Sequence, residues 1–266
     1  MLLRVGGTEI NTNRRAWDSE EWVEYFQRNA DNLRPIPWDA GAEITEVERT
    51  AISSSIQGFQ LGESSEGRHL FQRAKQWSDN NCDHAYTQAI RLFIKEEQRH
   101  AYELGQFMDI NGIPRVKRAF SDSAFRFLRR SAGLETSIVV LITAEVIAQV
   151  YYVALRDATA STVLQNICHQ ILQDEEEHVR FQSERLALMA ARHGRLRFLL
   201  RRGVQRCLMA ATLPVVWSAH HRAYRAGRFS FGRYASETWA ALERALLRTD
   251  PRAYEPAALF EIAARQ

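Results

Sequence analysis

The sequence predicts an all-α protein built around a four-helix bundle. Apolar residues recur at helical spacing along nearly the whole chain, and no convincing segment alternates apolar and polar residues as a strand would. The 266 residues include only 13 glycines and 6 prolines, too few for a loop-rich all-β protein. With 45% hydrophobic and 25% charged residues, the chain can form a globular core and is too apolar to be disordered.

The first predicted element is a short amphipathic helix that begins near Asp18. Glu21, three residues later, is suited to cap the helix start, and Trp22 lies on the apolar face. The segment 34–38, RPIPW, ends this helix and leads as an extended linker into the main body. We therefore assign residues 1–44 to an N-terminal extension.

Four long helices follow, and the lengths of their loops indicate how they connect. The first and second helices, and likewise the third and fourth, are joined by only a few residues, which forces antiparallel neighbours. A long crossover over residues 110–133 joins the second helix to the third. Two hairpins connected in this way form a four-helix bundle, which we assign to residues 45–193. The expected helices span residues 45–78, 82–109, 134–158 and 161–193.

Two further helices, 195–226 and 232–249, belong to a C-terminal extension over 194–266 that we expect to pack on the bundle. The first of them carries five arginines close to Leu199, Leu200 and Val204. It could be a basic interfacial helix for anionic lipid. We favour a fifth bundle helix with one solvated basic face, because the bundle needs covering. The arginines are Arg195, Arg197, Arg201, Arg202 and Arg206.

Charge and cysteine content exclude several classes of protein. The net charge is only +3, which gives no argument for nucleic-acid binding. Three widely spaced cysteines without a C-x-x-C pair indicate neither a disulfide framework nor a thiolate zinc site.

The N-terminus lacks the apolar stretch of a signal peptide, and the longest nearly unbroken apolar run, 207–217, is too short to span a bilayer. We expect a soluble cytoplasmic protein with no transmembrane segment.

Each of the four long helices places one carboxylate on its apolar stripe. Positions seven apart nearly superimpose on a helix, and Ile56 and Leu70 bracket Glu63 at this spacing. The second and fourth helices add an imidazole three residues after their glutamate, on the same side. The four carboxylates are Glu63, Glu97, Glu145 and Glu175, and the two imidazoles are His100 and His178.

Burying four carboxylates together costs several kcal/mol for each, unless cations compensate them. Two Glu-x-x-His pairs with two further glutamates can hold two metal ions. Over residues 45–193 the chain resembles the ferritin-like di-iron and di-manganese carboxylate proteins, which carry this pattern on a four-helix bundle with one long crossover. The resemblance implies that Glu97 and Glu175 bridge the metals. It also implies that Glu63 with His100, and Glu145 with His178, are terminal ligands.

A third Glu-x-x-His motif joins Glu66 to His69. On a helix His69 lies about 100° from Leu70 and therefore off the apolar stripe, so we reject it as a ligand. Glu66 lies about 60° from Glu63, at the edge of the stripe, and is an alternative ligand. We favour Glu63.

Other polar residues receive weaker assignments. We expect Tyr151 and Tyr152 to pack rather than to act in redox chemistry, although Tyr152 is placed to hydrogen-bond a ligand. Glutamates beside the predicted ligands are expected to be solvated or to support them, and two glutamines near the stripe could orient them. The remaining histidines receive no metal. These residues are Glu96, Glu176, Glu177, Gln149, Gln182, His169, His220 and His221.

A carboxylate-rich site with two imidazoles suits iron or manganese. The resemblance implies an oxidase or oxygenase that uses two iron ions, or a Mn/Fe pair, with O2 as co-substrate and a small organic substrate. No nucleotide-binding motif is present, so the electrons would come from an external donor. A homodimer is compatible with this family. The alternative is an iron-handling protein for ferroxidase activity, storage or detoxification. We favour the enzyme, because the extensions carry tryptophans able to wall a substrate pocket and the chain is slightly basic.

Overall fold

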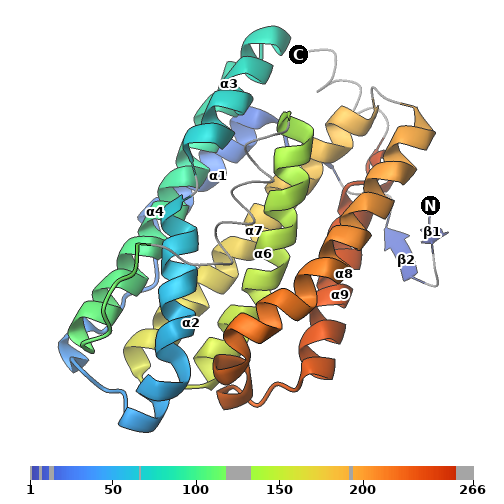
Figure 1. Cartoon of the computed structure of the whole chain (residues 1–266). Helices are drawn as coiled ribbons and strands as arrows, with labels where there is room; N and C mark the ends of the chain where they lie inside the picture. Colours follow the sequence, from blue (N-terminus) through green and yellow to red (C-terminus); the bar gives the residue numbers. More distant parts are fainter. Residues whose placement is uncertain are drawn as a thin grey trace.

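The computed structural model describes residues 2–5, 8–11, 15–65, 67–117, 133–191 and 194–255. Long helices lie side by side, with α1 along α4, and with α8 and α9 along α6 (Figure 1). The predicted all-α class is therefore confirmed. The helices are α1 (Ser19–Asp31), α2 (Glu46–Ser65), α3 (Arg68–Asn81), α4 (His84–Ile110), α6 (Leu134–Asp157), α7 (Thr162–Ala191), α8 (Arg195–Ala226) and α9 (Phe231–Arg248), with 3-10 turns at Trp38–Ala40 and Pro251–Ala253.

A small antiparallel hairpin precedes the helices and corrects the expectation of a chain without strands. Its strands are β1 (Leu2–Val5) and β2 (Thr8–Asn11), with Leu2 opposite Asn11 in the register. Four residues are too few to give the long alternating pattern by which a strand is predicted from sequence.

The start of α1 follows the prediction in detail. The Asp18 side chain accepts a hydrogen bond from the backbone N–H of Glu21, and the Glu21 side chain accepts one from the backbone N–H of Asp18. This reciprocal pair satisfies two backbone donors that the first helical turn leaves without partners. Trp22 and Phe26 then bury α1 in the common hydrophobic core.

The helix predicted over 45–78 is in fact two helices, α2 and α3, separated near Gly67. The φ angle of Gly67 is +135°, a conformation that residues with a side chain rarely adopt. A Cβ atom at this position would lie only 2.9 Å from a side-chain carbon of Ile94 on α4. The glycine therefore turns the chain and lets it pass close to α4. Glu66, the alternative ligand, lies outside the described residues, as does most of the predicted crossover.

The most apolar helix, α6, occupies the middle of the molecule. Among the described residues it is the one helix long and apolar enough to cross a membrane, by length and composition alone. However, 83% of its apolar window is buried in the protein, and α7, α8 and α9 all pack against it. Its position as a core helix supports the expectation of a soluble protein over a membrane-spanning one.

The outer face of α8 differs from the predicted solvated basic face. Four of its arginines pair with acidic residues of neighbouring elements: Arg197 and Arg201 with Glu135, Arg202 with Asp250 and Arg206 with Glu243. Leucine and valine side chains occupy the solvent side instead. Helical periodicity shows that α8 has apolar positions but does not show which of them the bundle covers.

We expect Gly227→Ala to destabilise the protein by about 3 kcal/mol, at the upper end of overpacking costs. A Cβ atom at Gly227 would lie 2.1 Å from the backbone oxygen of Ala154, so the end of α8 and α6 would have to separate. The control is Gly203→Ala within α8, where nothing lies within 4 Å and a gain of about 0.5–1 kcal/mol is expected. Urea unfolding measures both changes, and equal stabilities would contradict the close approach.

Candidate metal centre

The structure brings all six predicted ligand residues to one buried centre. Four helices supply them, one inward carboxylate each from α2, α4, α6 and α7, with the two imidazoles on α4 and α7. Their donor atoms form two groups, and within each group every pair of atoms lies within 4.8 Å. The first group is Glu63, Glu97, His100 and Glu175, and the second is Glu97, Glu145, Glu175 and His178.

Glu97 and Glu175 belong to both groups. Each group therefore resembles one metal-binding half of a dinuclear site, and the two shared carboxylates lie where bridging ligands would have to lie. This cluster could hold metal ions without any rearrangement of the helices. The sequence pattern had no means of showing that these two glutamates occupy the shared position, since spacing along a helix does not report contacts between helices.

The polar atoms of the cluster are left without hydrogen-bond partners although they are buried. Among the described residues this holds for Glu97 Oε1, Glu145 Oε1, both carboxylate oxygens of Glu175, and Nδ1 of both His100 and His178. Such atoms are costly in a protein interior unless something else satisfies them. All of them face one another. Cations between them fit this arrangement, because the orphaned atoms are oxygen and imidazole nitrogen donors for iron or manganese.

His178 illustrates the fit most clearly. Its Nδ1 atom lies 3.0 Å from Oε1 of Glu97 and 3.8 Å from Oε2 of Glu175, without the geometry of a hydrogen bond to either. A neutral imidazole nitrogen and a carboxylate oxygen both carry lone pairs, so they approach this closely only when a cation or a proton lies between them. His100 Nδ1 faces Glu63, Glu97 and Glu175 at 3.8–4.0 Å in the same way.

The pKa values of the buried carboxylates also indicate that the centre needs compensating positive charge. Burial raises the pKa of Glu97 to about 8, with further contributions from the negative charges of Glu145 and Glu63. Burial and the nearby charge of Glu175 raise the pKa of Glu145 well above its usual range. The pKa of Glu175 is also raised, chiefly by burial. Without metal ions the centre must therefore retain protons, which bound cations would replace.

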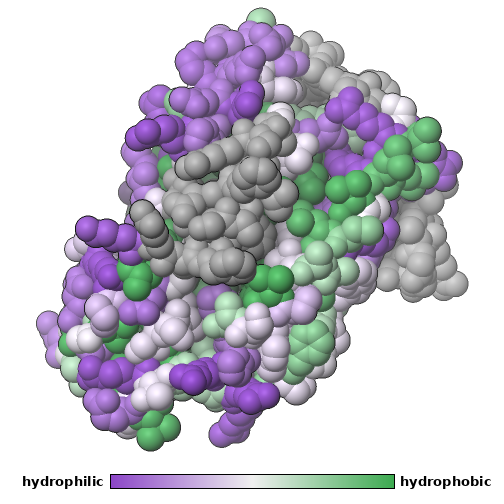
Figure 2. Space-filling view, viewed as in Figure 1, coloured by the Kyte–Doolittle hydropathy of each residue, from purple (hydrophilic) through white to green (hydrophobic). Residues whose placement is uncertain are grey.

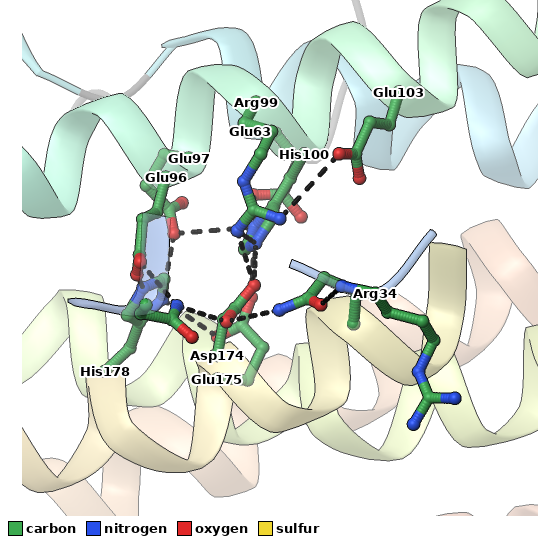
Figure 3. A network of polar contacts seen from close by, with 12 residues as sticks. Arg34, Glu63, Glu96, Glu97, Arg99, His100, Glu103, Asp174, Glu175 and His178 are labelled. Carbon is green, nitrogen blue, oxygen red and sulfur yellow. Dashed lines mark hydrogen bonds and ion pairs between the residues drawn. The ribbon is translucent and has the colours of Figure 1, made fainter. Parts of the chain in front are cut away.

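A second layer of carboxylates holds the two imidazoles in a crosswise pattern (Figure 3). Asp174 on α7 binds Nε2 of His100 on α4 at 3.0 Å, and Glu96 on α4 binds Nε2 of His178 on α7 at 2.9 Å. Each acid thus supports the imidazole of the opposite helix. With Nε2 engaged in this way, Nδ1 of both rings is turned toward the cluster, which is how a second layer orients metal-binding histidines.

The two supporting acids are themselves joined by α1. Asn29 donates hydrogen bonds from Nδ2 to Glu96 Oε1 at 2.6 Å and to Asp174 Oδ1 at 2.8 Å. Asp174 also accepts hydrogen bonds from Arg99 and Gln170. Burial disfavours the charge of Asp174, but these contacts, led by the one to His100, outweigh it and lower the pKa of the carboxyl. Asp174 therefore remains ionised and keeps its imidazole partner oriented.

Tyr152 forms a hydrogen bond with one of the predicted ligands. Its hydroxyl is buried and donates a hydrogen bond to Oε1 of Glu63, leaving the other oxygen of Glu63 to face His100. Tyr151 packs instead, with its ring stacked on Phe59 at a centroid separation of 3.4 Å. The hydrogen bond from Tyr152 to a predicted ligand, which its position on the helix allowed, is thus present, and Tyr151 packs as expected.

The other sequence assignments have mixed outcomes. Glu96 supports a predicted ligand, whereas Glu176 is exposed and pairs with Arg248, and Glu177 pairs with Arg180. Gln149 donates to the backbone oxygen of Glu175, so it steadies α7 rather than a ligand side chain. Gln182 is buried, but neither of its amide atoms bonds to the part of the chain that the structure describes. Of the histidines set aside, His69 and His169 are exposed, and buried His220 bonds to Ser55.

Asp174 and Asn29 were missed by the sequence analysis. A signal for Asp174 was present, because an acidic residue directly precedes both functional Glu-x-x-His motifs, as Glu96-Glu97 and as Asp174-Glu175. This repeated pair distinguishes them from the motif that begins at Glu66. No comparable signal marks Asn29, which reaches the centre only because α1 packs on α4.

Comparison with known proteins leaves the family open. The chain matches no model of a known protein family, and no curated protein is similar to it at a significant level.

Proposed function

We propose that the protein is an O2-activating oxidase or oxygenase with a dinuclear metal centre of two iron ions, or of one manganese and one iron ion. The observation that carries the proposal is the shared use of Glu97 and Glu175 by two complete groups of potential ligands. An isolated buried Glu–His cluster is compatible with one structural ion. Two overlapping groups with four carboxylates match the charge of two divalent ions.

In this proposal Glu97 and Glu175 would be shared by the two ions, Glu63 and His100 would complete the ligands of one, and Glu145 and His178 would complete those of the other. Two reduced ions there would supply two electrons together for the activation of O2. The chain's own groups fix the geometry: Asp174 and Glu96 hold the imidazoles, and Tyr152 holds one oxygen of Glu63. The burial of all six residues keeps bulk water away from the centre.

Action on a small organic substrate is the preferred branch of this proposal, with electrons from an external donor. The argument is the amount of helix added to the bundle. Besides the four helices that carry the predicted ligands, α1, α8 and α9 pack on those helices, and α1 and α8 contribute Trp22, Phe26 and Tyr224 to the core. A protein that only oxidises and stores iron needs no such covering, whereas an enzyme has to enclose its substrate.

The test is oxygen consumption by protein loaded with ferrous iron under anaerobic conditions. We expect about two ferrous ions per chain to be oxidised when air is admitted, and further O2 use only when a reductant is supplied. Glu176→Gln is the matched control, because Glu176 directly follows Glu175 but is exposed. This variant should oxidise about two ferrous ions per chain, as the unchanged protein does. Glu175→Gln should lack this oxidation of two ions per chain.

Continued oxidation of added ferrous iron, far beyond the loaded ions and with growth of a ferric mineral, would contradict the enzyme proposal. That result would assign the protein to iron storage or detoxification instead. Iron binding with no reaction toward O2 would contradict both.

A further inference from the structure

Helix α8 is apolar on two opposite faces, and the bundle covers only one of them. The inner face packs against α2, α6 and α9 through buried side chains such as Phe198, Met209 and Val216. The outer face carries an apolar stripe that remains in solvent, visible as a band of hydrophobic atoms over α8 (Figure 2). Its members are Leu196, Leu199, Leu200, Val204, Cys207, Ala211 and Val215.

The exposure of the stripe is large for residues of this kind. Leu196 is 72% exposed, Leu200 62% and Val204 63%. Leu200, Val204, Cys207 and Ala211 lie within about 60° of one another around the helix axis, so the side chains form one continuous surface and not scattered contacts. From Leu196 to Val215 this surface is about 30 Å long. Contiguous apolar surface of this extent marks an interaction site.

The charged side chains that α8 itself contributes are all positive, although Glu135 and Glu243 of neighbouring helices pair with Arg197, Arg201 and Arg206. The 32 residues of α8 contain seven arginines and no acidic residue. Arg222 and Arg225 at one end of α8 lie on the same side of the helix as the stripe, as does Arg197 at the other end, which is paired with Glu135 of α6. Arg222 and Arg225 are exposed and have no ion-pair partner within the described part of the chain.

We propose that α8 docks the protein onto an anionic lipid surface. The stripe would enter the headgroup region, and the arginines at both ends would bind lipid phosphates, as in helices that lie in the membrane interface. A second copy of the chain fits less well. Parallel pairing of two α8 helices would bring Arg222 and Arg225 of both copies together with no acidic residue of α8 to neutralise them, and antiparallel pairing would offer them only Glu135, which Arg197 and Arg201 already occupy. The proposal does not depend on the metal centre.

Co-sedimentation of the purified full-length protein with lipid vesicles tests the docking. We expect binding to phosphatidylcholine vesicles that contain about 30% phosphatidylglycerol, weaker binding without it, and a loss of binding as salt is added. Val204→Glu should weaken binding at least about ten-fold by placing a charge in the stripe. Tyr102→Glu is the matched control, because Tyr102 is 64% exposed on α4, away from α8, and this change should leave binding intact.

The arginines have their own test. Arg222→Gln combined with Arg225→Gln should lower the affinity for anionic vesicles about 25-fold, at roughly five-fold for each charge near such a surface, with little effect on phosphatidylcholine alone. Both side chains are exposed, so circular dichroism should show unchanged folding.

The two exposed cysteines allow a direct measurement of the contact. A polarity-sensitive fluorophore on Cys207, in a Cys82→Ser background, should shift to the blue when anionic vesicles are added. The same fluorophore on Cys82, in a Cys207→Ser background, should not shift, since Cys82 lies between α3 and α4.

Three outcomes would overturn the proposal. They are no binding to anionic vesicles, binding that Val204→Glu leaves unchanged, and a fluorophore shift at Cys82 as large as that at Cys207. A dimer in vesicle-free solution that Val204→Glu dissociates would also overturn it, since the stripe would then be an interface between two copies.

Discussion

Glu97→Gln is expected to abolish the binding of both metal ions, whereas Glu63→Gln and Glu145→Gln should each weaken one. Glu97 contributes to both groups of donor atoms, while Glu63 belongs only to the first and Glu145 only to the second. Glutamine preserves the side-chain volume and removes the negative charge, so a loss of metal reflects ligation and not a cavity. Elemental analysis should fall from about two ions per chain to none for Glu97→Gln, and to about one for the other two variants.

The experiment is stringent because each variant is expected to lose a specific number of metal ions. Glu175→Gln should behave as Glu97→Gln does, because Glu175 is the second shared residue. Glu103→Gln is a useful control, since Glu103 is a buried glutamate on α4 that belongs to neither group and faces Arg99. Two ions retained in both Glu97→Gln and Glu175→Gln, or one ion lost from Glu103→Gln, would refute the assignment of the bridging residues.

Removal of the metal ions is expected to lower the melting temperature by about 10–20 °C. Ligand that binds only the folded state at about 100 times its dissociation constant contributes about 2.7 kcal/mol, so two such ions contribute about 5 kcal/mol. For a chain of this size each kcal/mol corresponds to about 2–4 °C. Thermal unfolding with and without a chelator measures the difference, and the Glu97→Gln variant should show no effect of the chelator.

The metal-free protein should also lose stability as the pH rises from about 6.5 to 8. In this range an ordinary glutamate is ionised in the unfolded chain, whereas Glu97 keeps its proton in the folded protein because its pKa is about 8. The folded state then binds more protons than the unfolded state, so the free energy of unfolding falls with pH, by about 2 kcal/mol across this window for Glu97 alone. His100 and His178 act in the same direction, because carboxylate partners outweigh burial and raise the pKa of both.

Two comparisons isolate this pH dependence. Burial lowers the pKa of His220 to about 4, so this residue works in the opposite direction, but only below about pH 6.5, where the unfolded chain takes up its proton. Measurements above that pH avoid it. The slope should be shallower in metal-free Glu97→Gln and absent in the metal-loaded protein. A stability that rises with pH in the metal-free protein would show that the cluster does not hold protons in this way.

The six central residues were predictable because each lies on the apolar stripe of a long helix, and a charged side chain on such a stripe points into the core. Asp174 was harder to predict, since adjacent residues on a helix are 100° apart and the same rule places Asp174 off the stripe that holds Glu175. Its burial arises from α1, which covers that side of α4 and α7 through Asn29. Periodicity within one helix carries no information about a covering helix.

Some features of the fold could likewise be predicted from the sequence, and others could not. The capped start of α1 and the ends of α6 and α8 could be predicted from local residue chemistry. The break between α2 and α3 could not, because a single glycine inside an apolar helical pattern does not reveal that its φ angle is positive. The orientation of α8 was also out of reach. Arg201 and Arg206 turn inward to Glu135 and Glu243, partners distant in the sequence.

The crosswise hydrogen bonds from Asp174 to His100 and from Glu96 to His178 have a consequence for how the protein matures. Neither half of the chain contains an imidazole together with the acid that aligns it, so under the proposed function a nascent N-terminal half would hold no complete group of metal ligands. Under the proposed function, metal uptake would wait until synthesis has passed α7 and the two halves have docked. Cofactor loading would then report completed tertiary assembly, and partly made or misassembled chains would remain empty.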